Sequence, residues 1–205
     1  MKISSINFIG SGNVATNLAI RFFDAGIVVN SVWSRNLQNS QELAEHINAK
    51  AVESLEELTE ADLTIISIAD HALGMILGDL NINQKVVHTS GTIPLNEFIR
   101  FDKSGVFYPL QTLKKNDINR SAEIPILIES DDKEFQQSLI ELAKCITAKT
   151  AVLDSDQRKK LHVAAVMVNN FANQLFVEAS TVCNEFELDF NLLKPLIEET
   201  SRKAI

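Results

Sequence analysis

A short glycine run near the amino terminus is the first group of residues whose spacing suits a chemical task. Residues Gly10–Ala15 read G-x-G-x-x-A, directly after an apolar run and directly before a segment with helical periodicity. Gly10 permits a tight turn, Gly12 lets a pyrophosphate approach the backbone, and Ala15 lets a helix pack close to a sheet. The first N–H groups of that helix would face the phosphates. The run predicts a dinucleotide-binding loop, although a plain strand-turn-helix can contain the same residues.

The residues after the second predicted strand indicate which dinucleotide is bound. Ser34 and Arg35 stand where a carboxylate would hold the adenosine ribose of NAD. Arg35 can instead form charge-assisted hydrogen bonds to a 2′-phosphate, and Ser34 adds a hydroxyl donor. The pair therefore favours NADP over NAD. Two alternatives stay open, a solvated Arg35 at a helix start or a different adenine nucleotide such as FAD.

Two later predicted strands end in residues that should reach the same crevice, because ligands of open α/β sheets bind outside the carboxyl ends of the strands. Asp70 follows the first of these strands and is also suited to cap the next helix. Ser90 and Thr92 follow the second, and their hydroxyls are candidate substrate ligands, although a turn of small residues looks the same. The candidate cofactor-binding residues are Gly10, Ser11, Gly12, Asn13, Val14, Ser34, Arg35, Ile68, Ala69 and Asp70.

A polar stripe on a long helix-compatible segment supplies the candidate catalytic groups. His162, Asn169 and Asn173 are separated by seven and four residues, which places them on one face of a helix. Hydride transfer needs orientation and one proton donor or acceptor. Histidine suits that task, so His162 is the candidate proton relay. Asn169 would orient a substrate carbonyl or carboxylate, and Asn173 would bind substrate. Alternatively, the asparagines bond to a neighbouring helix or fix a dimer register.

The elements that must position these residues follow from the hydrophobic pattern. In the first helical segment Val14, Leu18 and Phe22 recur every four residues, and Gly26 stands where a C-terminal cap is expected. Another helix is expected to start at Ser54, which forms a capping-box pattern with Glu57. This alternation predicts an α/β fold with a doubly wound, mostly parallel Rossmann sheet. The predicted strands are Ile3–Ile9, Val28–Trp33, Leu63–Ile68, Lys85–Thr89, Gly105–Tyr108 and Pro125–Glu129, with weaker ones near Lys50–Val52 and Thr150–Leu153.

Strand signals stop after residue 153. The sequence therefore predicts a Rossmann dinucleotide-binding domain over residues 1–153 and a smaller all-helical C-terminal domain over residues 154–205. One helical run continues to about Phe186, and a last helix is expected over Asn191–Ala204. A helix as long as the first needs either a large partner within the chain or a second subunit, and we favour a homodimer through the C-terminal helices. Its apolar seam, spaced by four and three residues, comprises Leu161, Ala165, Val168, Ala172, Leu175, Ala179, Val182 and Phe186.

The overall composition excludes several functional classes. The 205 residues include 19 basic and 27 acidic side chains, for a formal charge of −8, which does not suit nucleic acid or anionic lipid. No apolar stretch reaches the roughly 18 residues of a membrane span. Cys145 and Cys183 stand far apart and are expected to be core residues of a protein in a reducing compartment, so we predict a cytoplasmic location. The four histidines are too dispersed to indicate a metal site.

Taken together, these motifs resemble a known family, the Rossmann-like proteins that carry a C-terminal domain of unknown function 2520. This family is related to coenzyme F420-dependent NADP reductases, pyrroline-5-carboxylate reductases and the 6-phosphogluconate dehydrogenase group. The resemblance implies an NADP-type cofactor on the first domain, a dimerising helical second domain, and a substrate pocket between them. It also raises the deazaflavin F420 as a further redox partner. The resemblance is carried by Gly10–Ala15, Trp33–Arg35, His88–Gly91, Tyr108–Thr112 and the helix from His162 to Asn169.

The chain departs from the family pattern in two ways. Tyr108 precedes a proline where the family usually has a histidine, and members are usually longer than 205 residues, so we expect the helical domain to be incomplete. Related dehydrogenases also have a lysine one turn before the equivalent of Asn169, where this chain has Ala165 and Val166. That lysine proton donor cannot be carried over, which leaves His162. The expected function is an NADP-dependent oxidoreductase that transfers hydride to or from a small polar metabolite. The alternative is a non-catalytic dinucleotide sensor.

Overall fold

The computed structural model describes residues 2–119 and 123–204 and contains two compact units, Met1–Lys160 and Leu161–Ile205. The division falls within helix α5 (Ser155–Val166) rather than after residue 153, where the sequence pattern changes. The reason is that the first turn of α5 is bonded to the sheet of the first unit, chiefly through the buried side chain of Arg158.

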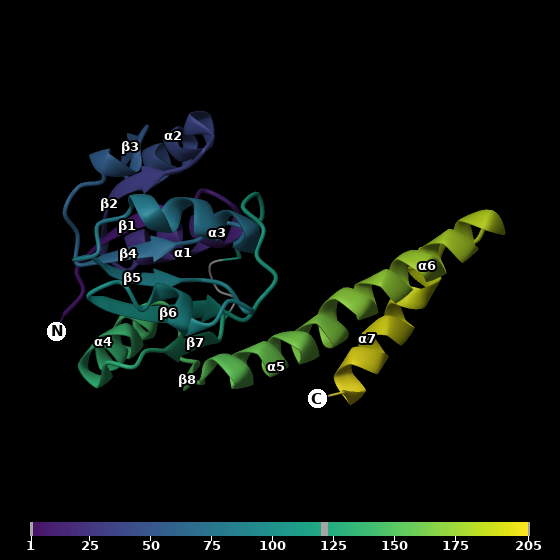
Figure 1. The fold of residues 1–205 in the computed structure, drawn as a ribbon. Coiled ribbons are helices and arrows are strands. Elements are labelled where there is room, and N and C mark those ends of the chain that lie inside the picture. Colours follow the sequence, from purple (N-terminus) through teal and green to yellow (C-terminus); the bar gives the residue numbers. More distant parts are fainter. Residues whose placement is uncertain (1, 120–122, 205) are drawn as a thin grey trace. The chain divides into compact units, whose positions relative to one another are not determined.

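The first unit is built on one eight-stranded sheet with the order β3-β2-β1-β4-β5-β6-β7-β8 (Figure 1). All neighbouring strands are parallel except β6 and β7, which pair antiparallel. The order reverses beside β1, as in a doubly wound sheet, so the predicted mostly parallel Rossmann fold is confirmed. The strands are β1 Ser5–Ile9, β2 Val28–Trp33, β3 Lys50–Val52, β4 Leu63–Ile66, β5 Lys85–His88, β6 Lys103–Pro109, β7 Ile126–Glu129 and β8 Thr150–Val152.

Apolar side chains cover both faces of this sheet. Adjacent residues of one strand belong to different hydrophobic clusters: Phe8 packs in one cluster and Ile9 in the other, and Val87 and Val86 divide in the same way. Because successive strand residues point to opposite faces, the sheet is buried on both sides. The first cluster includes α1 and α4 and the second includes α3. The α-helices that lie wholly within this unit are α1 Asn13–Asp24, α2 Leu37–His46, α3 Asp70–Ile76 and α4 Lys133–Lys144.

The predicted end of the first helix is confirmed, but the helix predicted to begin at Ser54 does not form. Helix α1 ends at Asp24, and Gly26 follows with φ +80°, a left-handed conformation that suits the predicted terminating glycine. The helix predicted from Ser54 is wrong, because only the single 3-10 turn Leu55–Glu57 forms. Directly after this turn, Thr59 forms hydrogen bonds with β1 and β2. The carbonyl of Thr59 accepts a hydrogen bond from Asn7 at 2.6 Å, and its hydroxyl bonds to a serine of β2.

The second unit is helical throughout its regular structure. Helix α5 continues into a π-helical turn, Met167–Phe171, and then into α6 (Ala172–Glu185), so the predicted long helix is confirmed. The last predicted helix is also present, as a 3-10 turn, Phe190–Leu193, followed by α7 (Lys194–Lys203). In the part of the chain that the structure describes, no helix is long and apolar enough to cross a membrane.

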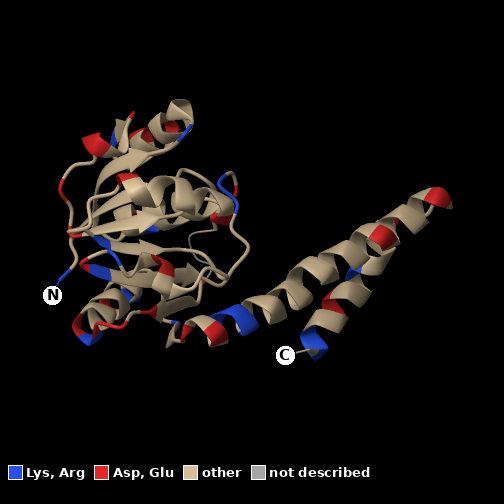
Figure 2. Cartoon of the chain, viewed as in Figure 1, with Lys and Arg blue, Asp and Glu red and all other residues tan. Residues whose placement is uncertain are grey.

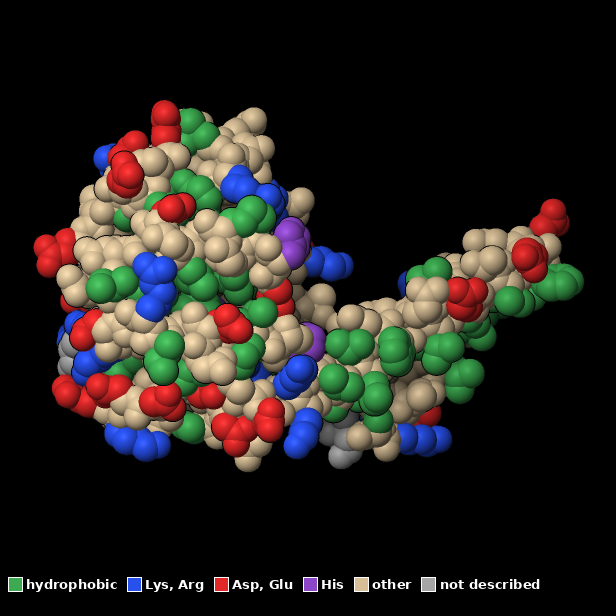
Figure 3. Space-filling model, in the orientation of Figure 1, with side chains coloured by type: hydrophobic (Ala, Val, Ile, Leu, Met, Phe, Trp, Pro, Cys, Tyr) green, Lys and Arg blue, Asp and Glu red, His purple; other side chains and the backbone are tan. Residues whose placement is uncertain are grey.

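The predicted apolar seam of this helix is exposed. Val168 and Leu175 have 77% and 68% of their surfaces open to solvent, and Phe186 has 69%. Figure 3 shows hydrophobic side chains gathered along these helices. Residues 161–177 contain no Asp, Glu, Lys or Arg, which leaves a long uncharged stretch in Figure 2. Of the two cysteines expected in the core, Cys183 is buried, but Cys145 is exposed at the end of α4.

Candidate dinucleotide site

The glycine loop lies between the ends of β1, β2 and β4. The N–H of Gly10 donates to the Trp33 carbonyl at 2.7 Å, and the N–H of Ser67 donates to the carbonyl of Ile9 at 2.7 Å. Gly10 has φ +117°, and a Cβ at this position would lie 2.1 Å from the carbonyl oxygen of Ser67. No side chain fits between the two strand ends, so the fold itself requires this glycine.

Gly12 has a different environment from Gly10. A Cβ on Gly12 would meet nothing within 4 Å, and its φ is −78°. Gly12 is the N-cap residue of α1, and no side chain caps the helix there. The first N–H groups of α1 are therefore available to an anion, as the glycine pattern predicts. Asn13 and Val14, also predicted to bind cofactor, are exposed and half-buried in this first turn.

The end of β2 presents the two residues predicted to select the dinucleotide. Ser34 is half-buried and Arg35 is exposed. Asn36 caps α2, because its side-chain oxygen accepts a hydrogen bond from the N–H of Gln38 at 3.0 Å. Arg35 makes no ion pair with any residue that the structure describes, which leaves its guanidinium able to bind a phosphate.

The ends of β4 and β5 are joined by a hydroxyl network. The Asp70 carboxylate accepts hydrogen bonds from the hydroxyls of Ser90, at 3.0 Å, and Thr92, at 2.5 Å. The prediction that Asp70 caps α3 is wrong: Ala69 is the N-cap, and Asp70 is the first helical residue. Its carboxylate is engaged by the β5 loop instead. Ile68 is half-buried beside this network. The structure thus brings together a predicted cofactor residue and both predicted substrate hydroxyls of this unit.

A buried polar cluster under this network has no counterpart in the sequence prediction. Arg158 is 1% exposed and forms an ion pair with Glu129 and a hydrogen bond to the carbonyl of Ile93. His88 is fully buried, and its Nδ1 accepts a hydrogen bond from the N–H of Ser90 at 3.2 Å. Burial, together with the positive charge of Arg158, lowers the pKa of His88 to about 3. His88 is therefore neutral and structural, not a proton donor.

Sequence spacing could not have revealed this cluster. Arg158 reaches Glu129 on β7 and Ile93 after β5, which lie 29 and 65 residues earlier in the chain. Tyr108 is half-buried near the same arginine. Burial raises the pKa of the Tyr108 phenol, so the phenol stays protonated near neutral pH.

The predicted catalytic residues lie in the second unit. Asn173 donates a hydrogen bond from Nδ2 to Oδ1 of Asn169 at 3.2 Å, so these two side chains are neighbours as predicted. Asn169 lies within the π-helical turn, a feature that often marks functional sites. His162 is half-buried in the α-helical part before this turn. Among the described residues, no group of three or more His, Cys, Asp or Glu could hold a metal ion.

Comparison with known proteins matches both parts of the chain. Residues 5–89 match the family model described as NADP oxidoreductase coenzyme F420-dependent, and residues 124–205 match the domain of unknown function DUF2520. The crystal structure of a "putative NADP oxidoreductase" from Bacteroides fragilis is 35% identical, with a TM-score of 0.89. The match covers 98% of this chain and 80% of that chain. The chain belongs to the Rossmann-like NADP oxidoreductase family. The resemblance inferred from the sequence motifs is confirmed.

More distant members of this fold share the same architecture. An imine reductase from Pseudomonas sp. is 19% identical with a TM-score of 0.77, and the match covers 100% of this chain and 75% of that one. A reductive aminase from Aspergillus terreus, in complex with NADPH and ethyl-5-oxohexanoate, is 15% identical with a TM-score of 0.76. That match covers 98% of this chain and 74% of the aminase. At these identities the likeness shows the fold alone. No curated protein matches the sequence.

Proposed function

We propose that this member of the NADP oxidoreductase family is an enzyme that binds NADP and transfers hydride to or from a small polar metabolite. The observation that carries the proposal is the uncapped amino terminus of α1, whose first N–H groups follow a glycine loop closed by β2 and β4. That arrangement suits a pyrophosphate. A bound NADP would supply or accept the hydride.

The preference for NADP rests on Arg35. An exposed guanidinium at the end of β2, with no carboxylate beside it in the sequence, favours a ligand that carries a 2′-phosphate. Calorimetric titration with NADP and NAD tests this preference, on the wild type and on Arg35→Ala. NADP binding should weaken by about 1.5–3 kcal/mol, the scale of a hydrogen bond to a charged group, while NAD binding should change little.

A matched control is Arg100→Ala, which removes an arginine of the same unit outside the β2 end. Equal losses for NADP and NAD in Arg35→Ala would refute selection by this residue. Unchanged binding in Arg35→Ala would support an adenine nucleotide without a 2′-phosphate, such as FAD. If the wild type binds neither dinucleotide, the oxidoreductase proposal itself fails.

The residues proposed to act on the substrate divide into two groups. Thr92 donates its hydroxyl proton to Asp70, so its oxygen keeps lone pairs that can accept a hydrogen bond from a substrate N–H or O–H. The Ser90 oxygen already accepts from the N–H groups of Thr92 and Ile93, so a substrate would reach Ser90 by taking the place of Asp70 as acceptor of its hydroxyl proton. His162 would move a proton, and Asn169 and Asn173 would orient the reacting group. Since two structural neighbours are an imine reductase and a reductive aminase, a screen for NADPH oxidation should begin with imines and ketones.

The screen separates the enzyme from the sensor. His162→Gln should lower the turnover rate but leave NADP affinity unchanged, since the histidine is proposed to act only in proton transfer. Tight NADP binding without turnover of any substrate, together with an NADP-dependent change in oligomeric state, would favour a sensor. The family model that matches residues 5–89 is described as coenzyme F420-dependent, so the same screen should include the reduction of F420 by NADPH.

We also propose that two copies of the chain pair through their C-terminal helices. The support is the exposed seam, because monomeric proteins rarely leave a continuous apolar patch of this kind open to water. Leu175→Asp, which puts a charge on the seam at a residue 68% exposed, should yield a monomer in analytical ultracentrifugation. Lys160→Asp, a charge change just outside the seam, should leave the dimer intact.

A cytoplasmic location remains our expectation for the protein. The acidic composition and the two unpaired cysteines, one of them exposed, suit a reducing compartment. Cell fractionation of the native protein tests this expectation. Recovery in an extracytoplasmic fraction would contradict it.

A further inference from the structure

Three polar side chains of α1 form hydrogen bonds with the loop that follows β6. Asn13 accepts a hydrogen bond from the Lys115 N–H at 3.0 Å, Asn17 donates to the Lys114 carbonyl at 3.1 Å, and Arg21 donates to the Asn119 carbonyl at 2.6 Å. These three residues are spaced by four along the helix, and Asn17 and Arg21 are only 2% and 7% exposed. Residues 114–119 of the loop are therefore held along α1, with Lys115 beside the first turn of the helix.

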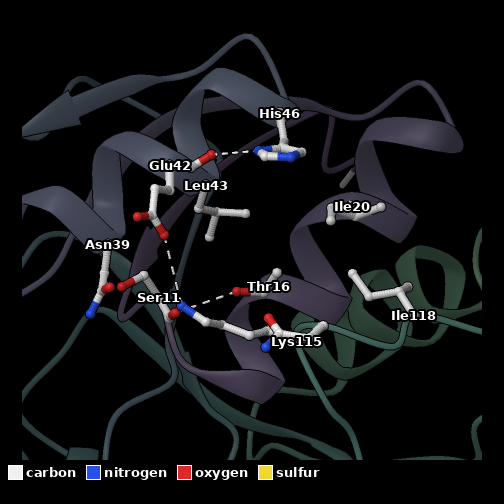
Figure 4. Close-up of a pocket in the computed structure, with 10 residues that line it drawn as sticks. Ser11, Thr16, Ile20, Asn39, Glu42, Leu43, His46, Lys115 and Ile118 are labelled. Atoms are coloured by element: carbon white, nitrogen blue, oxygen red, sulfur yellow. Dashed lines mark hydrogen bonds and ion pairs between the residues drawn. The ribbon is translucent and has the colours of Figure 1, made fainter.

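Helices α1 and α2 and this loop line an open cavity of about 370 Å³ (Figure 4). Ile20, Leu43 and Ile118 make its wall apolar. Ser11 and Lys115 line it as well, together with polar side chains of α2, and Figure 4 shows Lys115 extending across the cavity toward Ser11. The cavity thus begins at the second residue of the glycine run, where the phosphates of a dinucleotide are expected.

Ser11 provides an independent sign that this cavity receives a ligand. The residue is 6% exposed, yet its hydroxyl forms no hydrogen bond with any residue that the structure describes. The hydroxyl is open to the cavity that Ser11 lines, and a hydroxyl facing a cavity beside an uncapped helix terminus suits a phosphate oxygen as acceptor.

Lys115 is held only loosely where it stands. Its Nζ lies 3.9 Å from a carboxylate oxygen of Glu42, longer than the roughly 2.7–2.9 Å of a charge-assisted hydrogen bond. Both side chains are partly exposed, 37% and 53%, and such pairs contribute little stability. Glu42 also accepts a hydrogen bond from Gln38 at 3.3 Å, so it keeps a partner when the lysine moves. The ammonium is therefore available to a stronger anion nearby.

We propose that Lys115 pairs with a phosphate group of the bound dinucleotide, so that the loop after β6 completes the phosphate site begun by the glycine loop. This inference rests on the proposed binding of NADP. A phosphate oxygen at hydrogen-bond distance would attract the ammonium more strongly than the carboxylate of Glu42 does at 3.9 Å, and Ser11 would donate its hydroxyl to the same phosphate. Lys115 then becomes an affinity determinant that lies about 80 residues after the second strand, outside any glycine motif.

The test uses calorimetric titration of the full-length protein with NADP and with NAD. Lys115→Met removes the charge but keeps the length of the side chain. Lys114→Met is the matched control, because it makes the same change at an exposed neighbour outside this cavity. Glu42→Gln removes the competing carboxylate. We expect Lys115→Met to weaken NADP binding roughly tenfold to a hundredfold, with Lys114→Met close to wild type and Glu42→Gln equal or tighter.

Each outcome has a defined meaning. A loss confined to NADP identifies the 2′-phosphate as the partner of Lys115, and an equal loss for NAD identifies the pyrophosphate; either result supports the inference. If the wild type binds NADP and Lys115→Met behaves like Lys114→Met, the inference is overturned while the proposed function stands. Weaker binding in Glu42→Gln would also overturn it. If the wild type fails to bind, the proposed function fails instead. Equal melting temperatures of the two methionine variants exclude a folding defect.

Discussion

Replacing Gly10 by alanine should destabilise the first unit severely. The new Cβ would lie 2.1 Å from the carbonyl oxygen of Ser67 and 2.8 Å from its carbonyl carbon. These are backbone atoms, and the Ser67 N–H is itself bonded to β1 at 2.7 Å, so relief requires β1 and β4 to separate. The φ of +117° alone costs a non-glycine residue about 1–3 kcal/mol. With the clash added, we expect a loss of about 3 kcal/mol or more.

Gly12→Ala should behave in the opposite way. Its φ of −78° suits any residue, and its Cβ would meet nothing within 4 Å. Stability should therefore change by less than about 1 kcal/mol, the usual range for alanine in place of glycine at an N-cap. Affinity for NADP should fall, because the methyl group occupies space that the pyrophosphate needs beside the helix.

Urea unfolding followed by circular dichroism gives the stability of both variants, and NADP titration gives the affinity of each variant that folds. Protein concentration must be held constant, because association of copies would add to the apparent stability. The reasoning is refuted if Gly10→Ala is as stable as the wild type, or if Gly12→Ala loses as much stability as Gly10→Ala. Either result would mean that the contacts of the glycine run do not divide into one structural and one ligand-binding position.

Two further predictions concern the buried polar cluster. Arg158→Met should cost about 3–5 kcal/mol in urea unfolding, because it leaves the largely buried Glu129 carboxylate without its cation; adding Glu129→Gln should restore part of that loss, and no restoration would refute the pairing argument. His88 has a pKa near 3 in the fold and 6.5 when exposed, so the unfolded chain binds its proton first and stability should fall as pH drops below 6.5. The slope contributed by this one group is at most about 1.4 kcal/mol per pH unit. His88→Asn, which keeps an acceptor for the Ser90 N–H, should show a smaller slope between pH 7 and pH 5, and an unchanged slope would contradict the assignment.

The strands and the long helix could be predicted because their signals are local. Runs such as Val28–Trp33 and Lys50–Val52 coincide with β2 and β3, since apolar β-branched residues between turns specify a strand without reference to the rest of the chain. The glycine loop was predictable for the same reason, because Gly10 and Gly12 adjoin a strand and a helix in sequence. The family resemblance rests on these local motifs as well.

The wrong predictions concern residues whose partners lie far away in sequence. Asp70 has the side chain of a helix cap, but two hydroxyls 20 and 22 residues later engage it instead. Ser54 begins a capping-box pattern, yet the chain after Glu57 is tied to β1 and β2 and cannot continue as a helix. Lys115 carries no local signal at all, because its position depends on a loop held by α1. Propensity decides such cases only when no tertiary contact competes.

The apolar seam shows what periodicity can and cannot specify. The four-three spacing correctly predicts one helix from about residue 155 to 185, and it places Val168 and Leu175 on a common face. Periodicity does not say what covers that face, and in the single chain both residues are more than half exposed. Helices with so few charged residues gain most of their stability from buried apolar area. An exposed seam therefore leaves the second unit with little stabilisation from packing. Its unfolding should therefore shift to higher urea as protein concentration rises, whereas unfolding of the glycine-loop unit, with its own two-sided core, should respond less.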